Sequence, residues 1–298
     1  MRRRRGSSFS IHFGNFHFSL QSLTWIGIVF SVAFCLWSSL YFDSFHVARY
    51  YLYETGDRIL EACGFRSAYD NLSLGAPEGR PVDRIFERRG YAYGYAEKLE
   101  QPLWVTYKLT IGELSGMKQL RTDDFREDPR ILTRSASPDD YKDSGFDRGH
   151  LAPAADMSWD REIMSESFFM SNMSPQRPEF NRGVWLDLEN LVRSFARKEK
   201  EVFIVTGPVF EPGKKWQTIG ANRVVVPDAF YKVVLDLTPP RKMIGFIVPN
   251  RRGSKKLAKY ACTVKAVEDA TGLVFFPKLD PAEAGRLKSS VTLADWGL

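Results

Sequence analysis

The chain has 298 residues, of which 44% are hydrophobic and 26% charged, and this composition excludes a disordered protein while allowing one large folded domain or two small ones. The net charge is +6, but removing the four arginines Arg2–Arg5 from the 42 basic residues leaves 38 against 36 acidic ones. Bulk charge therefore says little about substrate, and any phosphate-binding surface must be local. Three cysteines exclude a disulfide framework and a four-cysteine zinc site, and whether Cys63 and Cys262 pair is left open.

The N-terminal segment predicts a membrane anchor that follows a basic tail at residues 1–21. Residues 22–42 carry no charged side chain, and an apolar helix of this length crosses roughly 30 Å of hydrocarbon. Because the arginines precede this span, we expect a single-pass, N-in protein whose remaining chain lies on the far side. That side is the bacterial periplasm, or the intermembrane space if the anchor sits in the mitochondrial inner membrane. A cleaved signal peptide and an arginine-rich mitochondrial presequence are the alternatives, although no A-x-A cleavage site follows the span.

The next segment, residues 43–84, connects this anchor to a folded domain. Residues 44–63 have a mixed apolar and charged spacing that is compatible with a juxtamembrane helix. The following stretch is rich in Gly, Pro and Ser, which is typical of a linker. We therefore expect the folded domain to occupy residues 85–298.

Strands dominate the pattern of this domain. Runs rich in aromatic and β-branched residues predict strands within 91–99, 102–111, 202–210, 222–237 and 243–250. Apolar residues at helical spacing predict three helices, Asp160–Phe168, Asn181–Lys198 and Ser254–Ala270. The predicted class is α+β with a strand-rich core.

A polar motif, Asp147-Arg148-Gly149-His150, follows the first predicted strands. The other three histidines lie at or before residue 46, so His150 is the only histidine of the predicted domain. Sites with several histidine ligands are therefore excluded there, and no Walker loop, G-x-G-x-x-G or G-x-S-x-G motif is present. A lone histidine is more often a structural residue, but its Gly- and Pro-rich surroundings suit a strand end or loop that presents polar groups.

A second polar stretch begins about 20 residues later. It predicts an apolar strand that ends at Asn172, a proline-bounded turn, and a helix that starts near Asn181. From Asn181, the residues Trp185, Glu189 and Arg193 follow at i+4 steps and share one helix flank. An amide, a carboxylate and a guanidinium on one flank suit a metal and phosphate surface. The alternative is an exposed flank that carries a Glu189–Arg193 ion pair.

Together the two stretches resemble the DNA/RNA non-specific endonuclease family, the ββα-metal nucleases that include endonuclease G. Asp147–His150 fit the D-R-G-H motif of the family, and the second block is matched in order and spacing by Asn172, Pro175, Gln176, Asn181, Trp185 and Glu189. A weaker resemblance extends over Ile85–Lys278. It implies a ββα-metal finger within the α+β core, and a sequence-non-specific hydrolase of DNA and RNA that leaves 5′-phosphate ends.

The resemblance also implies roles at the reaction centre. His150 would be the general base, and Asn181 would be the direct ligand of Mg²⁺, for which Mn²⁺ can substitute. Glu189 would hold a water of the metal's hydration shell.

Three more residues complete this expected site. Arg148 and Arg193 would contact phosphate oxygens with their forked guanidinium donors. Asn172 would support the site geometry, and Asp147 would anchor the loop.

The resemblance leaves several alternatives open. Members of the family commonly dimerise, but no residue pattern identifies an interface. The short sequence after the last predicted strand favours an endonuclease over an exonuclease. The rival functions are a catalytically silent, membrane-tethered nucleic-acid-binding protein and an envelope structural or adaptor protein. Metal-dependent degradation of plasmid DNA separates both from a nuclease.

Overall fold

The computed structural model describes residues 10–13, 16–19, 55, 70–131 and 133–298, which fall into two compact units. The first unit holds an antiparallel pair of short strands, β1 (Ser10–Phe13) and β2 (Phe16–Ser19). The predicted membrane span at 22–42 lies outside the described residues, as does the predicted juxtamembrane helix apart from Thr55. Among the helices that the structure describes, none has the length and apolarity needed to cross a membrane.

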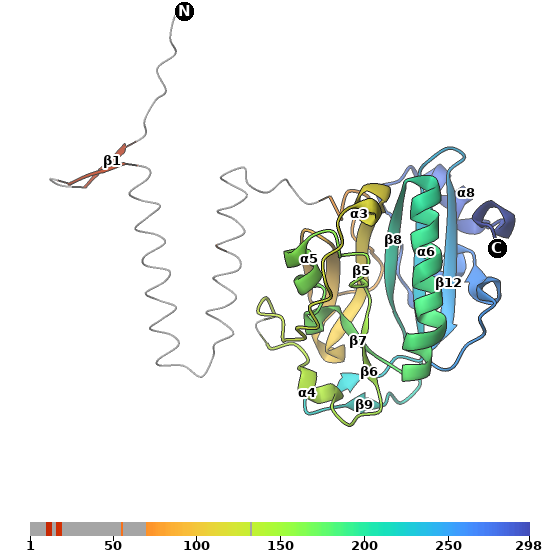
Figure 1. Cartoon of the computed structure of the whole chain (residues 1–298), viewed down its shortest axis with the longest axis horizontal. Coiled ribbons are helices and arrows are strands. Elements are labelled where there is room, and N and C mark those ends of the chain that lie inside the picture. The colour runs from red at the N-terminus through yellow and green to blue at the C-terminus, as the bar shows by residue number, and fades with distance from the viewer. Residues whose placement is uncertain (1–9, 14–15, 20–54, 56–69, 132) are drawn as a thin grey trace, which may run out of the picture. The chain divides into compact units, whose positions relative to one another are not determined.

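The second unit is built on a seven-stranded antiparallel sheet of order β13-β12-β11-β8-β5-β4-β3 (Figure 1). Its long central strands coincide with the runs of aromatic and β-branched residues, whose side chains pack well on a pleated surface. The seven strands are β3 (Arg84–Glu87), β4 (Ala92–Ala96), β5 (Gln101–Thr110), β8 (Glu201–Val209), β11 (Ala229–Asp236), β12 (Lys242–Pro249) and β13 (Ala261–Cys262).

The two faces of the sheet are covered by different helices. On one face Tyr231, Val233 and Leu235 of β11 join a hydrophobic core with residues of α7 (Val264–Thr271) and α8 (Pro281–Ser289). Because side chains alternate along a strand, Phe230 and Lys232 of β11 point to the opposite face. That face is covered by α6 (Leu186–Glu199), which lies in front of the sheet in Figure 1 and buries Leu188, Val192 and Phe195 among others.

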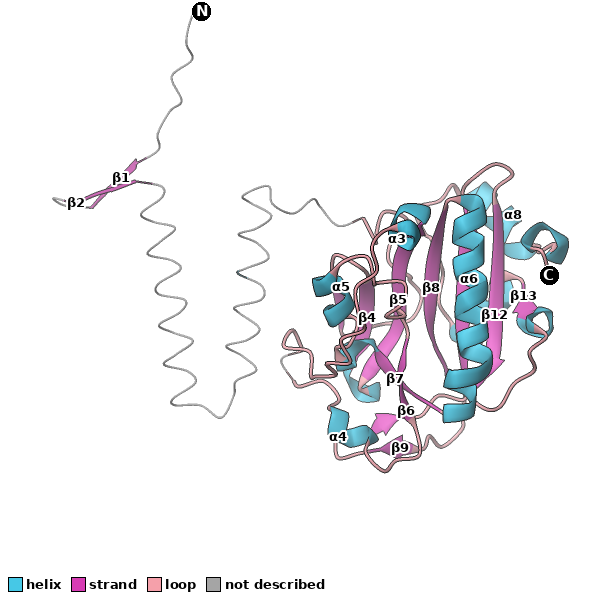
Figure 2. Cartoon of the chain, in the orientation of Figure 1, coloured by secondary structure: helices cyan, strands magenta, loops and turns pink. Residues whose placement is uncertain are grey.

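A small two-stranded sheet followed by a helix confirms the expected ββα finger. Strand β6 (Asp147–His150) pairs antiparallel with β7 (Met173–Gln176), so that Asp147 faces Gln176 and His150 faces Met173. The chain then enters η3 (Phe180–Trp185), a π-helical segment with a kink at Gly183 that leads into α6. Strands β6 and β7 lie at the lower end of the main sheet in Figure 2, whereas α6 lies in front of it.

Shorter elements connect these parts. Helix α5 (Arg161–Glu166) begins at the cap Asp160, whose carboxylate accepts hydrogen bonds from the backbone of Glu162 and Ile163. The remaining short elements are η1 (Glu97–Leu99), α3 (Ile111–Ser115), α4 (Pro138–Tyr141), η2 (Met170–Asn172), β9 (Thr218–Ile219), β10 (Val224–Val225), η4 (Leu257–Tyr260) and η5 (Leu293–Trp296).

Two predicted elements differ from the structure. The helix expected over Ser254–Ala270 is interrupted, because Ala261 and Cys262 extend the main sheet as β13 before α7 begins at Val264. The strand expected to end at Asn172 is shifted, because the chain first forms η2 and the strand begins at Met173. In both cases pairing with a neighbouring strand decides the outcome, and such pairing leaves no local signal.

The segment before residue 85, which the sequence assigns to the linker, takes part in the domain core. Leu72, Leu74, Ala76 and Val82 pack against the buried cluster on the α7 and α8 face of the sheet. The packed unit therefore begins before residue 85.

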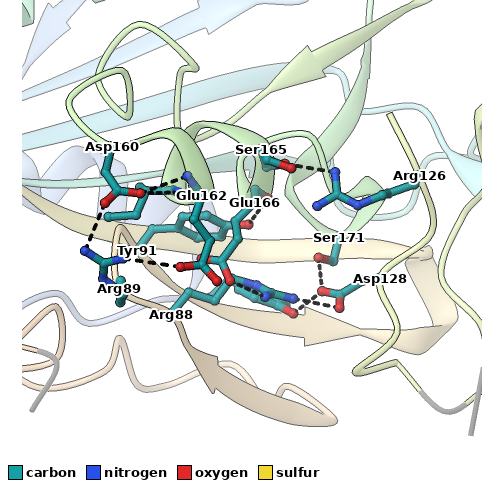
Figure 3. A network of polar contacts seen from close by, with 12 residues as sticks. Arg88, Arg89, Tyr91, Arg126, Asp128, Asp160, Glu162, Ser165, Glu166 and Ser171 are labelled. Atoms are coloured by element: carbon teal, nitrogen blue, oxygen red, sulfur yellow. Dashed lines mark hydrogen bonds and ion pairs between the residues drawn. The ribbon is translucent and has the colours of Figure 1, made fainter. Parts of the chain in front are cut away.

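A buried polar network fixes the segment that leads into β7 (Figure 3). Arg88, in the turn after β3, donates to Asp128 at 2.7 Å and to Glu166 of α5 at 3.2 Å. Asp128 also accepts hydrogen bonds from the hydroxyls of Tyr93 and Ser171. Ser171 lies in η2, so this network holds the start of the second finger strand against the main sheet.

Candidate active site

The pairing of β6 with β7 requires the glycine of the D-R-G-H motif. A Cβ atom at Gly149 would overlap the side chain of Gln176, which is fully buried and cannot move aside easily. A glycine therefore lets the two strands approach closely, and it fixes the register that places His150 at the end of β6. The motif, expected at a strand end or in a loop, is itself the strand.

The imidazole of His150 lies against two phenyl rings. Its centroid is 4.8 Å from that of Phe168 and 5.7 Å from that of Phe125, both in edge-on geometry. The half-buried ring has its Nε2 atom shielded from solvent and without a hydrogen-bond partner among the described residues. A shielded ring nitrogen without a partner can accept a proton from a bound water.

Two arginines stack on the same two rings. The guanidinium carbon of Arg148 lies 4.2 Å from the ring centroid of Phe125, and that of Arg121 lies 4.8 Å from the centroid of Phe168. Both arginines are exposed, so each has one side on an aromatic ring and the other toward solvent. The histidine therefore lies between two solvent-facing cations, which is a suitable surface for a phosphodiester.

The charge state of His150 follows from these surroundings. Burial is the main cause that lowers its pKa to about 3, and the positive charges of Arg121 and Arg148 contribute to the fall. The imidazole is consequently neutral at physiological pH, which a general base must be. A phosphate that neutralises the two arginines would remove their share of this shift and make the imidazole more basic.

Asn172 supports the chain that follows His150. Its fully buried side chain donates to the backbone oxygens of Ala152 (2.9 Å) and Ser167 (2.8 Å) and accepts from the backbone nitrogen of Ala152 (2.9 Å). Every polar atom of the amide is thus used within the protein. This arrangement agrees with a role in site geometry and leaves no group of Asn172 for substrate.

Asp147 and Asn181 meet at the other end of the finger. The Nδ2 atom of Asn181 donates to Asp147 Oδ2 at 2.9 Å, and Arg182 donates to both oxygens of the same carboxylate at 2.7 and 2.9 Å. Asp147 therefore orients the amide of Asn181, which leaves the amide oxygen available as a ligand. An amide oxygen supplemented by water is a donor set that suits Mg²⁺. The described residues contain no cluster of three or more His, Cys, Asp or Glu side chains that could hold a metal.

Glu189 lies on α6 near an unexpected buried cation, Lys232 of β11. The Nζ atom of Lys232 is shielded from solvent, has no hydrogen-bond partner among the described residues, and lies 4.8 Å from the ring of Trp185. Burial raises the pKa of Glu189, while the positive charges of Lys232, Arg193 and Arg121 oppose that rise. Burial lowers the pKa of Lys232, while Glu189 and Asp156 oppose the fall. The two groups thus stabilise each other's charged forms.

Arg193 has a different partner from the one that its helical spacing favours. It donates to Asp156 at 2.7 Å and to Asn190 at 2.7 Å, rather than forming the i+4 ion pair with Glu189. Asp156 also accepts a hydrogen bond of 2.8 Å from the hydroxyl of Tyr107. The Arg193 side chain is therefore largely buried and held in place, although it still lines a cavity beside the site.

The structure brings the expected residues together in three groups: Asn181 with Asp147, His150 with Arg148, and Glu189 with Arg193. Arg121 connects the last two, because its charge acts on both His150 and Glu189. Sequence reasoning missed Arg121, Phe125 and Lys232. For Lys232 there was one signal, a charged residue in the middle of a strand whose other interior residues are uncharged.

Comparison with known proteins decides the family. The family model described as DNA/RNA non-specific endonuclease matches residues 75–282. The chain belongs to this family. It is 36% identical over 219 residues to mitochondrial endonuclease G of Homo sapiens, a match that spans 69% of this chain and 73% of the human protein.

Two further similarities agree with this assignment. The nuclease is 38% identical over 226 residues to nuclease C1 of Cunninghamella echinulata, a match that spans 70% of this chain and 89% of that one. It also superposes on a chain of a solved complex of endonuclease G with its inhibitor EndoGI. The TM-score is 0.64 with 31% identity, over 71% of this chain and 91% of the other. The α+β fold and the enzyme class predicted from the sequence, a hydrolase of the nuclease type, are thereby confirmed.

Proposed function

We propose that this nuclease is a metal-dependent endonuclease that hydrolyses phosphodiester bonds of DNA and RNA without sequence specificity. The observation that carries the proposal is the environment of His150. Its neutral imidazole has a shielded Nε2 atom with no hydrogen-bond partner in the described part of the chain, and it lies between the exposed guanidinium groups of Arg121 and Arg148. Family membership and the names of the relatives support the same activity.

The reaction needs a base, a charge clamp and protonation of the leaving group. His150 Nε2 takes a proton from a water, whose oxygen then attacks the phosphorus atom. Arg148 and Arg121 hold the non-bridging oxygens and stabilise the added negative charge. The bond to the 3′ oxygen breaks, and that oxygen receives a proton from a water at the site, which gives a 5′-phosphate and a 3′-hydroxyl.

A divalent metal fits the end of the finger where Asp147 orients Asn181. We assign Asn181 Oδ1 as the protein ligand of Mg²⁺, which keeps most of its waters and needs few protein groups, and Mn²⁺ as a substitute. When bound, the metal supplies positive charge next to the leaving 3′ oxygen. Glu189 accepts a hydrogen bond from a water at the site when it is ionised, and Lys232 favours that state.

We infer low sequence selectivity from the kind of groups at the site. Guanidinium groups on aromatic rings contact backbone phosphates, which carry no sequence information. The residues expected to contact substrate include no base-reading helix. DNA and RNA are therefore the expected partners, and the homodimer remains a proposal taken from the family.

We also keep the N-terminal anchor as a proposal. Residues 22–42 would hold the nuclease domain on the far side of a membrane from the arginine-rich tail. Relatives named as mitochondrial favour the intermembrane space over the bacterial periplasm. Protease protection of the domain in intact organelles or cells is the expected result, and cleavage of the domain from the cytoplasmic or matrix side would overturn the orientation.

The activity is tested with the full-length chain in mild detergent. Supercoiled plasmid and a structured RNA are incubated with Mg²⁺, Mn²⁺ or EDTA, and His150→Ala is compared with Lys265→Gln, an exposed charge on α7. We expect both substrates to be degraded only with metal, by the wild type and the control variant. His150→Ala should lose roughly 10²–10⁴-fold in rate. DNA binding without any cleavage by the folded, metal-supplied wild type would instead support the catalytically silent binding protein.

A further inference from the structure

A cavity of about 380 Å³ lies beside the proposed reaction site, between the segment that follows α3 and the second half of α6. Four basic side chains line it: Lys118, Arg121, Arg193 and Arg197. Every other residue of the lining is uncharged. The cavity therefore concentrates positive charge next to the groups that we assign to the cleaved phosphodiester.

The lining cations are only partly compensated by the protein. Arg193 is paired with Asp156, and Arg121 is paired with the exposed Asp123 at 2.7 Å. Arg197 is exposed and has no hydrogen bond or ion pair to any residue that the structure describes. Two cations of the cavity thus have no carboxylate partner among the described residues, since Lys118 donates only to the backbone oxygen of Glu113 at 2.9 Å.

Lys118 and Arg197 also repel each other across the cavity. Burial lowers the pKa of Lys118, and the charges of Arg197 and Arg193 contribute to the fall, against the opposing effect of Asp156. Bringing an anion into the cavity would relieve this repulsion.

The position of the cavity indicates which anion it takes. Arg121 belongs both to its lining and to the surroundings of His150 and Glu189. Along α6, Arg193 and Arg197 follow Glu189 at successive i+4 steps, and each step is a displacement of about 6 Å along the helix. The cavity is therefore placed where the next phosphate would lie on a strand whose cleaved phosphate is at His150.

The segment that contributes Lys118 and Arg121 to the cavity also exposes two apolar side chains, which suit a nucleotide rather than a free anion. Leu120 and Met117, in the segment that carries Lys118 and Arg121, are 90% and 85% exposed. Apolar side chains next to phosphate-binding cations can contact the sugars and bases between successive phosphates. Both are neighbours in sequence of the cations that line the cavity.

We propose that Lys118 and Arg197 bind the backbone phosphate adjacent to the cleaved one on a DNA or RNA strand. This subsite rests on the proposed nuclease function and deepens it. It makes the enzyme act on a strand rather than on an isolated phosphodiester, without adding any sequence preference.

The experiment measures DNA binding in the His150→Ala background, where the substrate stays intact. Fluorescence anisotropy with a short labelled duplex gives the affinity over a series of KCl concentrations. The variant is Lys118→Gln with Arg197→Gln. Its matched control is Lys265→Gln with Arg286→Gln, which also removes two exposed positive charges, from α7 and α8 on the opposite face of the sheet.

We expect the slope of log affinity against log salt to fall by about 1 in the Lys118/Arg197 variant, the value for one lost phosphate contact, with weaker binding to every duplex sequence. The control should keep the parental slope. A salt slope equal to that of the control would overturn the proposed subsite. A loss of affinity confined to one DNA sequence would also overturn it. Failure of the wild type to cleave nucleic acid would instead refute the proposed function, because the salt slope is measured without catalysis.

Discussion

At the residue scale, the proposed role of Glu189 predicts that its charge sets the pH range in which the enzyme works. His150 is neutral above about pH 3, so its protonation does not limit activity at ordinary pH. Burial raises the pKa of Glu189 above the usual carboxylate range. Since we propose that the ionised form accepts the hydrogen bond of a water at the site, activity should rise with pH as Glu189 loses its proton.

The proposed role of Glu189 predicts how the pH profile of Glu189→Gln differs from that of the wild type. Glu189→Gln should lower the rate by roughly 10–100-fold and remove the acid limb of the profile of kcat/KM against pH, because the amide does not titrate. Plasmid cleavage at constant ionic strength between pH 5 and pH 9 measures it. An unchanged acid limb in Glu189→Gln would show that another group controls the limb.

Lys232 provides a second prediction at this scale. The groups that act on Glu189 are Lys232 from β11, Arg193 from α6, Asp156 after β6 and Arg121 after α3. Lys232→Met removes the largest of the charges that oppose the rise, so the pKa of Glu189 should increase and the acid limb should move to higher pH.

The same variant separates a functional role from a structural one. Lys232→Met removes the main counter-charge of Glu189, so it should cleave more slowly than the wild type at pH 7. The double variant Lys232→Met/Glu189→Gln leaves neither charge of the buried pair, so it should unfold at an equal or higher temperature than Lys232→Met alone. In the Glu189→Gln background, Lys232→Met should cause little further loss of activity. If Lys232→Met lowered the activity of Glu189→Gln as much as it lowers that of the wild type, Lys232 would not act through Glu189.

At the element scale, the finger depends on the close contact between β6 and β7. Gly149→Ala would place a methyl group into the buried side chain of Gln176, and we expect a loss of about 1–3 kcal/mol in the free energy of unfolding together with most of the activity. Gly285→Ala in α8 is the control, because a methyl group there meets no atom within 4 Å and alanine favours a helix. Urea unfolding and plasmid cleavage give the two readouts. Equal stability of the two variants would contradict the argument.

At the scale of the whole molecule, the network around Arg88 holds the finger to the main sheet and makes the fold sensitive to acid (Figure 3). Asp128 is fully buried, and Arg88 with the hydroxyls of Ser171 and Tyr93 outweighs burial and lowers the pKa of its carboxyl to about 2. In the unfolded chain this carboxyl titrates near about 4. Between these values the unfolded state binds more protons, so stability is present above pH 4 and is lost as pH falls toward 2.

The loss of stability at acid pH has an expected size. The Asp128 contribution should be about 2 kcal/mol between pH 4.5 and pH 2, measured as the difference in the pH dependence of unfolding between the wild type and Asp128→Asn. The variant should also be less stable at pH 7, because Arg88 then lacks a buried counter-charge. Parallel stability curves for the two proteins at acid pH would contradict this role.

The sequence by itself determined the main strands, the α+β class and the family, and it singled out the histidine that we propose as the base. These features are local: strand propensity is read from short runs, and the D-R-G-H motif and the Asn181 block carry their chemistry in consecutive or i+4 positions. The resemblance was specific because two such blocks occur at a set spacing. The membrane anchor over residues 22–42 also comes from a local pattern, and it stays a prediction because these residues lie outside the described structure.

Only the tertiary structure decided which side chains surround those positions. The main sheet places Lys232 under Glu189, the Arg88 network fixes the start of β7, and the chain before the finger brings Arg121 and Phe125 to His150. It also gave Arg193 a partner, Asp156, that lies 37 positions away in sequence rather than four. Such contacts depend on strand order and register, which are set by packing over the whole domain and are not encoded in any short segment.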